Sequence, residues 1–219
     1  NRKKIDTFAV TKGMEERVNN FIQKQVDEGR QAYIVCPLVE ENEEMNLKSV
    51  TALAEKYKNE VFKDYKVEYL HGKMKNKEKD EIMERFKNGD IDILISTTVI
   101  EVGVNVPNAS LMVVENAERF GLAQLHQLRG RVGRGEYQSY CILKYQGNSD
   151  VIRKRMKVMT DTNDGFIISE KDLELRGSGE FFGTRQHGLP EFKIANLFED
   201  MPVLKQVQAL AIKITEEDP

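Results

Sequence analysis

The chain of 219 residues has no tryptophan, two cysteines and five prolines. Cys36 and Cys141 both lie in apolar runs typical of strands. We therefore expect buried, reduced thiols, and neither a disulfide nor a metal pair. No apolar run approaches the roughly 18 residues of a membrane-spanning helix, and no secretory leader is recognisable. These absences predict a cytoplasmic protein that is neither exported nor inserted into a membrane.

An excess of one charge is also absent. Lysine and arginine number 33 and aspartate and glutamate 36, for a formal net charge of −3. The chain as a whole therefore lacks the basic excess of many nucleic-acid-binding proteins, although a local basic site would be sufficient for binding. The three histidines, His71, His126 and His187, have no ligand spacing, so we expect no bound metal on this chain.

Strand-like and helix-like segments alternate up to about residue 146. The expected strands are 5–10, 32–39, 67–70, 91–96, 111–114 and 139–145. Segments with apolar residues at helical spacing separate most of them. This alternation predicts an α/β fold, in which helices cover both faces of a parallel sheet. Because such folds bind ligands beyond the carboxyl ends of strands, we consider the loops around residues 71, 97 and 130 first.

The alternation stops after residue 147, so we expect two domains, 1–147 and 148–219, of which the second is mainly helical. Its expected segments are a basic helix over 151–159, a capping box at 169–172 with a short helix to about residue 175, a glycine-rich loop over 176–188 and a last helix from residue 200.

A turn rich in arginine and glycine precedes the last expected strand. Residues 124–135 read Gln-Leu-His-Gln-Leu-Arg-Gly-Arg-Val-Gly-Arg-Gly. We expect Gly130 to end the helix in a left-handed conformation. Arg131 and Arg134 then leave a tight turn together, and their planar forks suit a phosphoryl group that gains negative charge. A basic surface turn is the alternative. In the helix, Leu122, Leu125 and Leu128 share one face, and the polar residues Gln124, Gln127 and Arg129 lie on other, outer sides.

The loop from Thr97 to Pro107 follows a buried strand and contains a hydroxyl pair, a carboxylate, a glycine and an Asn-x-Pro turn. The hydroxyls of Thr97 and Thr98, with free backbone N–H groups, can bind nucleic-acid phosphates without base readout. The alternative is an ordinary strand-to-helix connection with a solvated Glu101.

Together these segments resemble superfamily 2 helicases and translocases, specifically the second of their two RecA-like motor domains. Residues 32–37 resemble motif IV, 94–107 motif V, and 127–134 the Gln-x-x-Gly-Arg-x-Gly-Arg form of motif VI. The resemblance implies that Arg131 and Arg134 reach the γ-phosphate of ATP bound on the other motor domain. An arginine supplied in this way contributes about a thousandfold or more to hydrolysis.

The resemblance also implies roles for other residues of these motifs. Gln127 would help to close the nucleotide cleft. Gly103, Asn105 and Gly130 would lie near the nucleotide. Thr97 and Thr98 would lie near the DNA backbone.

Residues 172–177 and 179–188 resemble the translocation motif of RecG-type helicases, a helical hairpin and loop that couples ATP-driven closure to movement along duplex DNA. We expect Arg176, Arg185 and Gln186 to tie this hairpin to the motif VI helix. The transcription-repair coupling factor shares the hairpin but usually has an acidic residue where Arg185 stands. His187 departs from the family pattern, in which serine is usual.

The resemblance implies an ATP-dependent translocase or helicase of double-stranded DNA that unwinds or regresses stalled forks and Holliday junctions in recombination and repair. The sequence contains no Gly-x-x-x-x-Gly-Lys-Ser/Thr cradle and no Asp-Glu-x-His segment. We therefore expect ATP and Mg²⁺ to be bound mainly by a first motor domain N-terminal to residue 1, and this chain alone to be inactive. A repair-coupling translocase, an RNA helicase and a non-catalytic RecA-like binding module are the alternatives.

Arg185→Ala in the intact protein is expected to keep much of the ATPase activity and to lose fork unwinding, because it removes a coupling contact and leaves the arginine pair in place. ATP turnover and unwinding of a forked DNA, measured side by side, check this. Equal losses of both activities would count against a coupling role.

Overall fold

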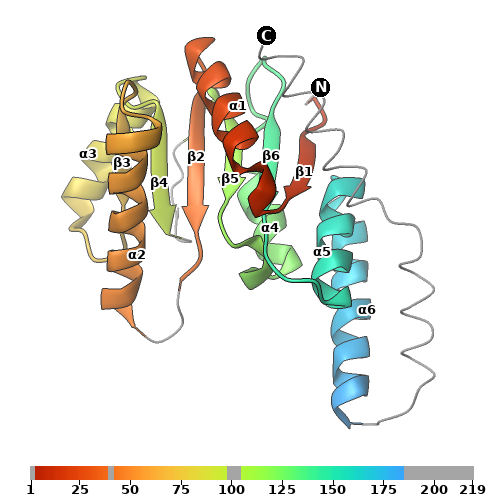
Figure 1. Cartoon of the computed structure of the whole chain (residues 1–219). Coiled ribbons are helices and arrows are strands. Elements are labelled where there is room, and N and C mark those ends of the chain that lie inside the picture. Colours follow the sequence, from red (N-terminus) through yellow and green to blue (C-terminus); the bar gives the residue numbers. More distant parts are fainter. Residues whose placement is uncertain (1–2, 39–41, 98–104, 185–219) are drawn as a thin grey trace.

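The computed structural model describes residues 3–38, 42–97 and 105–184, and the side chains of these ranges up to residue 177. Its centre is a six-stranded sheet in which all neighbouring strands are parallel, in the order β1-β6-β5-β2-β4-β3 (Figure 1). The strands are β1 Asp6–Val10, β2 Gln31–Cys36, β3 Val67–Leu70, β4 Ile93–Thr97, β5 Ala109–Val114 and β6 Tyr140–Lys144.

Helices connect and cover these strands. The α-helices are α1 Glu15–Asp27, α2 Glu43–Lys56, α3 Asn76–Lys87, α4 Leu122–Arg129, α5 Asp150–Asp161 and α6 Gly165–Thr184. Shorter turns are the 3-10 segments Lys12–Met14 and Ala117–Arg119 and the π-helical segment Tyr57–Val61, which continues α2. No helix in these ranges is long and apolar enough to cross a membrane.

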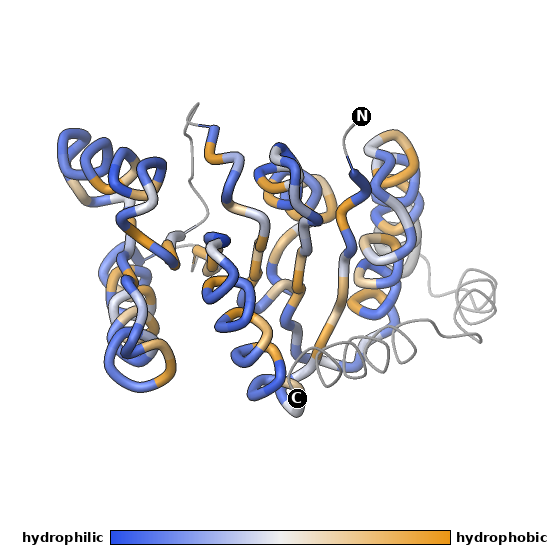
Figure 2. Tube along the Cα trace, turned by 90° about the horizontal axis from the view of Figure 1, so that it is seen from above, coloured by the Kyte–Doolittle hydropathy of each residue, from blue (hydrophilic) through white to orange (hydrophobic). Residues whose placement is uncertain are grey.

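Burial on both faces explains why the strands read as apolar runs. Every residue of β2, β4 and β5 is buried, as is typical of parallel sheets covered by helices. One face packs against α1 and α2, through residues such as Phe21 and Val50. The other packs against α3, α4 and α5, through residues such as Phe86, Leu125 and Met159. Figure 2 shows hydrophobic positions along the strands and hydrophilic positions on the outer helices.

The structure confirms the predicted fold class and all six expected strands; β3 has the predicted bounds, and those of the other strands differ by at most three residues. The helix expected over 151–159 is α5. It packs on the sheet, since Met156 and Met159 belong to the same buried cluster as the leucines of α4. The division of the chain at residue 147 stays a prediction.

The segment after α5 corrects two predictions. The helix expected to begin with the capping box at 169–172 begins at Gly165, because the Asp164 side chain accepts a hydrogen bond from the Phe166 N–H at 2.9 Å. Ser169 lies inside the helix, where its hydroxyl donates to the Gly165 carbonyl at 2.9 Å. Residues 176–184, expected in a loop, continue α6. Residues 185–188 and the expected last helix lie outside the described ranges.

Burial explains this longer helix. Ile168 and Leu175, one on each side of the supposed capping box, are both in the core. Packing of these two side chains helps to offset the helix penalty of the three glycines that follow, Gly177, Gly179 and Gly183. A local start signal was therefore overridden by contacts with other helices.

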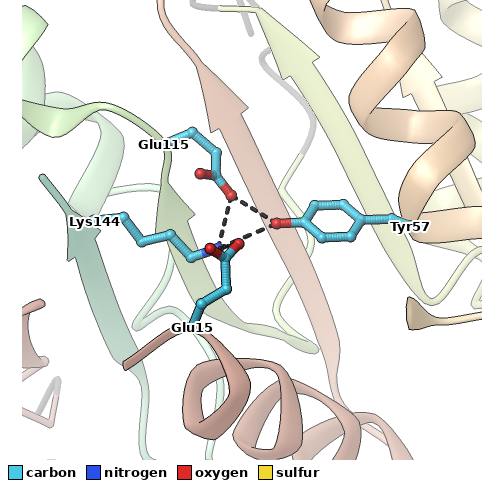
Figure 3. Close-up of polar contacts among 4 residues, drawn as sticks. All are labelled: Glu15, Tyr57, Glu115 and Lys144. Carbon is cyan, nitrogen blue, oxygen red and sulfur yellow. Dashed lines mark hydrogen bonds and ion pairs between the residues drawn. The ribbon is translucent and has the colours of Figure 1, made fainter. Parts of the chain in front are cut away.

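Four side chains join different elements at the carboxyl ends of β5 and β6 (Figure 3). The Lys144 ammonium lies 2.9 Å from a Glu115 oxygen and 3.4 Å from a Glu15 oxygen. It also lies 3.1 Å from the Tyr57 hydroxyl, which donates to Glu115 at 2.7 Å. Burial, then the Glu115 carboxylate, raises the pKa of Tyr57. The cluster links α1, the end of α2, β5 and β6 in the partly buried rim of the sheet.

Tyr57→Phe is expected to lower the free energy of unfolding by about 1 to 3 kcal/mol, because it removes a hydrogen bond to a partly buried carboxylate. Urea denaturation of this chain measures the change. Tyr69→Phe is the matched control, since the structure shows no hydrogen bond of the Tyr69 hydroxyl within the described residues and Tyr69 also lies on the sheet. Equal stability of the two variants would show that the cluster contributes little.

Candidate functional site

Helix α4 carries the arginine-rich turn. At its start, the Gln124 side chain accepts a hydrogen bond from the Gly121 N–H at 3.0 Å. Leu122, Leu125 and Leu128 are buried, which confirms the predicted apolar face. Gln127 is exposed on another side of the helix. Three leucines therefore fix how α4 lies on the sheet and leave the amide of Gln127 accessible.

The turn that follows α4 lies at the amino ends of β1 and β5. A Cβ on Gly133 would lie 3.0 Å from Ile5, and one on Gly135 would lie 2.4 Å from the carbonyl oxygen of Pro107. The Gln138 side chain donates to the Lys4 carbonyl at 2.7 Å. These contacts involve the residues just before β1 and β5, so two separate segments of the chain hold the turn in place.

This placement corrects the expectation that all three candidate loops share the carboxyl edge of the sheet. His71 follows β3 and Thr97 ends β4, so both lie at that edge. The loop around residue 130 lies at the opposite edge. The reason is topological, because this loop precedes its strand, β6, whereas the other two follow theirs. The structure therefore separates the candidate residues into two groups.

The glycines of the turn differ in backbone conformation and in the space around them. Gly130 has a φ of −66°, so the left-handed conformation predicted there is wrong. Gly133 adopts that conformation, with a φ of +84°. At Gly135 the close approach of the Pro107 carbonyl leaves no room for a Cβ. The bend is thus made three residues later than the sequence suggested, and the backbone contact at Gly135 holds it in place.

Arg131 and Arg134 are the two arginines of the turn, the first partly buried and the second exposed. Arg134 is exposed, and its Nε donates weakly to the Gly130 carbonyl at 3.4 Å. Burial raises the pKa of the Tyr33 phenol in β2 to about 12, while the charges of Arg131 and Arg134 both act to lower it. Both positive charges therefore act on the buried phenol of Tyr33.

Other predicted nucleotide contacts lie nearby. Asn105 is exposed and stands two residues before Pro107, against which Gly135 packs. Gly130 ends α4 in the same region. Gly103 lies outside the described residues. The amino edge of the sheet therefore collects Asn105, Gly130 and the two arginines.

The predicted nucleic-acid contacts are at the other edge. Thr97 is the last residue of β4 and its side chain is only 4% exposed. Thr98 lies outside the described ranges. The structure thus places Thr97 away from the arginine pair, and its contact with DNA stays a prediction.

The predicted coupling residues are only partly described. Arg176 is on α6, where its side chain is 68% exposed and pairs with Asp172 of the same helix at 3.3 Å. No hydrogen bond or ion pair joins Arg176 to α4 within the described residues, and the predicted network stays a prediction. Arg185 and Gln186 lie outside the described residues.

Two arginines that were not predicted as site residues, Arg129 and Arg155, hold α4 in place. Arg129, expected on an outer side of α4, is 2% exposed and donates to Thr7 and to the Met159 carbonyl. Arg155 on α5 donates to the carbonyls of Phe120 and Glu118 at 2.7 and 3.0 Å, just before α4. Helical spacing gave no signal for either, because α5 and α6 cover sides of α4 that an isolated amphipathic helix would expose.

The turn borders a cavity of about 590 Å³ at the amino end of β1. Its lining comes from the segment before β1, from the end of α4 and from the loop joining α5 and α6, and includes Lys4, His126, Arg129, Gly133 and Asn163. Within the described ranges, no three His, Cys, Asp or Glu residues are grouped closely enough to hold a metal ion. The lining also includes the carboxylates of Asp161 and Asp164, so the cavity offers both charges as well as amide groups.

Gly135→Ala is expected to lower the free energy of unfolding by about 1 to 3 kcal/mol, since the new methyl group would collide with the Pro107 backbone. Gly130→Ala is the matched control, with contacts no closer than 3.4 Å and a right-handed backbone. Thermal and urea unfolding of this chain compare the two. Two equally stable variants would mean that the close approach at Gly135 is relieved without strain.

Comparisons with known proteins match these features. The helicase conserved C-terminal domain matches residues 14–136, and domain 3, C-terminal, of the ATP-dependent DNA helicase RecG matches residues 162–219. RecG of Bacillus subtilis is 47% identical over 99% of this chain, and RecG of Streptococcus pneumoniae 48% identical over 100%. The chain spans 32% and 33% of these relatives, about a third of their length.

Solved structures show the same relationship. A structure of RecG bound to a three-way DNA junction has a TM-score of 0.69 and 45% identity, and the match covers 93% of this chain and 26% of that one. Dbp5 of S. cerevisiae, bound to RNA and ADP BeF3, has a TM-score of 0.52 and 17% identity over 79% of this chain and 44% of its own, and shows the RecA-like fold alone. The chain therefore belongs to the helicase conserved C-terminal domain family and, within that family, to the RecG helicases.

Proposed function

We propose that this chain is the second motor domain of an ATP-dependent translocase or helicase that acts on branched, double-stranded DNA in recombination and repair. Its RecG relatives are named ATP-dependent DNA helicases, and one related structure holds a three-way DNA junction. The main observation behind the proposal is the pair of arginines, Arg131 and Arg134, on the turn after α4. The working enzyme would be a full-length cytoplasmic protein that contains a first motor domain as well.

In this proposal Arg131 and Arg134 act on ATP, which with Mg²⁺ is bound mainly by the first motor domain. ATP supplies the phosphoryl group whose oxygens gain negative charge during hydrolysis. Their turn is held by the close approach of Gly135 to the Pro107 backbone. A preorganised pair of this kind stabilises the developing charge with little rearrangement. Gln127, exposed one turn earlier, would help to close the cleft.

The two edges of the sheet would then have different ligands. Asn105 and Gly130 would face the nucleotide at the amino edge, and Thr97 would face the DNA backbone at the carboxyl edge. Gly103 would share the first role and Thr98 the second, although both lie outside the described residues. Helix α4 runs from one edge to the other, since it follows β5 and ends beside the start of β1. A movement of α4 would therefore displace residues at both edges of the sheet.

The helical extension would couple ATP hydrolysis to movement along DNA. We take residues 1–147 as the motor domain and 148–219 as the extension, with Arg176, Arg185 and Gln186 as coupling residues. Support comes from α5, whose Arg155 holds the segment before α4 through two carbonyl groups. The chain alone would be inactive, because the first motor domain is its partner in catalysis.

Arg134→Ala in the full-length protein is expected to lower DNA-stimulated ATP turnover about a thousandfold, because it removes charge stabilisation from the phosphoryl group. Binding of forked DNA, measured across a range of salt concentrations, should be unchanged, since Arg134 is not at the proposed DNA edge. Steady-state ATP turnover with and without forked DNA provides the measurement.

Arg85→Ala is the matched control for this experiment. Arg85 is an exposed arginine of α3 that pairs with Glu68 at 3.4 Å, and its loss should leave turnover close to that of the wild type. Unchanged turnover in Arg134→Ala would mean that the turn is only a basic surface, and the proposed role of the arginine pair would fail.

A further inference from the structure

Arg129 is a buried cation at the base of the arginine-rich turn. It is the last residue of α4, two positions before Arg131 and five before Arg134. Its side chain is 2% exposed and is the largest among the fully buried side chains of the described residues. A guanidinium group is rarely buried without a specific task, because it must give up its hydration.

No carboxylate compensates this charge within the described part of the chain. Burial lowers the pKa of the Arg129 guanidinium, and the Cys141 thiol is the ionisable neighbour that acts in the opposite direction. Burial also raises the pKa of Cys141 to about 12, so this thiol carries no charge at neutral pH. An apolar side chain of similar length would fill the site without the desolvation cost. Stability alone therefore does not account for an arginine here.

The partners of Arg129 come from three elements. One terminal nitrogen donates to the Thr7 hydroxyl of β1 at 3.2 Å and to the Met159 carbonyl of α5 at 2.6 Å. The other lies 3.4 Å from Nδ1 of His126, one turn earlier in α4. A planar, rigid fork bonded in several directions fixes the orientation of the helix end as well as its position.

The surroundings leave this helix end little freedom. A Cβ on Gly165, the first residue of α6, would lie 2.8 Å from Nε2 of His126, so α6 begins in close contact with α4. Val132, which follows the first arginine of the pair, is 2% exposed and belongs to the same buried cluster as Met159. The base of the turn is thus enclosed by β1, α5 and α6.

We propose that Arg129 is the positioning residue of the arginine pair. Its guanidinium holds the end of α4 against β1 and α5, so that Arg131 and Arg134 begin from a fixed base. This role rests on the proposed function of the pair in ATP hydrolysis. Because Arg129 is buried, it would act through the turn and would not bind nucleotide or DNA itself. It also gives the helical extension a direct contact with the arginine-bearing helix through the Met159 carbonyl.

The main experiment uses the full-length protein with Arg129→Met, which fills the site without donors, and Arg129→Lys, which restores the charge and some donors. We expect Arg129→Met to lower kcat for DNA-stimulated ATP turnover at least about tenfold, because small misplacements of catalytic groups have effects of this size. KM for ATP should change less than about threefold, since most ATP contacts would lie on the first motor domain. Arg129→Lys should recover part of the lost kcat.

Thr7→Val tests the same contact from its other side and changes the volume of the side chain little. We expect a smaller loss of kcat, about two- to fivefold, and no further loss when Thr7→Val is added to Arg129→Met, because the contact is then already broken. If Arg129→Met does not fold, Thr7→Val with Thr7→Ser as its rescue variant decides the matter.

Tyr57→Phe serves as the control for lost stability. It removes a buried polar contact at the opposite edge of the sheet and should leave kcat unchanged. Wild-type kcat in Arg129→Met, or an equal fall of kcat in Arg129→Met and Tyr57→Phe, would overturn the positioning role. If Arg134→Ala also kept full turnover, the proposed function itself would have failed, and the two failures are thereby distinguished.

Discussion

Burial of a parallel sheet on both faces is the constraint from which the other features follow. Strands β2, β4 and β5 have no exposed residues, so helices must cover both sides of the sheet. Each connection between parallel strands must then cross from the carboxyl edge back to the amino edge. Helix α4 makes one such crossing, and this is why the arginine-rich turn lies at the amino edge.

The two edges carry different chemistry as a result. The carboxyl edge has Thr97 and the cluster in which Lys144 meets two carboxylates (Figure 3). The amino edge has the arginine pair, held where Gly135 meets the Pro107 backbone. Under the proposed function, one rigid domain would contact the nucleotide at one edge and DNA at the other. Because a packed sheet deforms little, a load applied at one edge is transmitted to the other.

Much of the fold and part of the site could be predicted from the sequence. The strand at 67–70 has the predicted bounds, and the leucine face of α4 is buried as expected, because both depend on local hydrophobic periodicity.

Three other predictions failed for non-local reasons. The left-handed residue is Gly133 instead of Gly130, because the contacts of Gly133 with Ile5 and of Gly135 with Pro107 determine the path of the turn. Helix α6 begins earlier and runs further, because Ile168 and Leu175 are buried by other helices. Arg129 was assigned to an outer side of α4, and only the packing of α5 shows that this side is internal.

Helix α4 has only eight residues, which is too short to be stable in water as an isolated peptide. Its helical state depends on three buried leucines, on Arg129 and on the neighbouring helices that bury them. The arginine pair can therefore be presented only after the sheet and α5 have assembled. A partly folded chain, during synthesis or after damage, would contain the motif in its sequence without the fixed turn that presents it. Under the proposed function, the contribution of the arginine pair to ATP hydrolysis would therefore depend on cooperative folding of the whole domain.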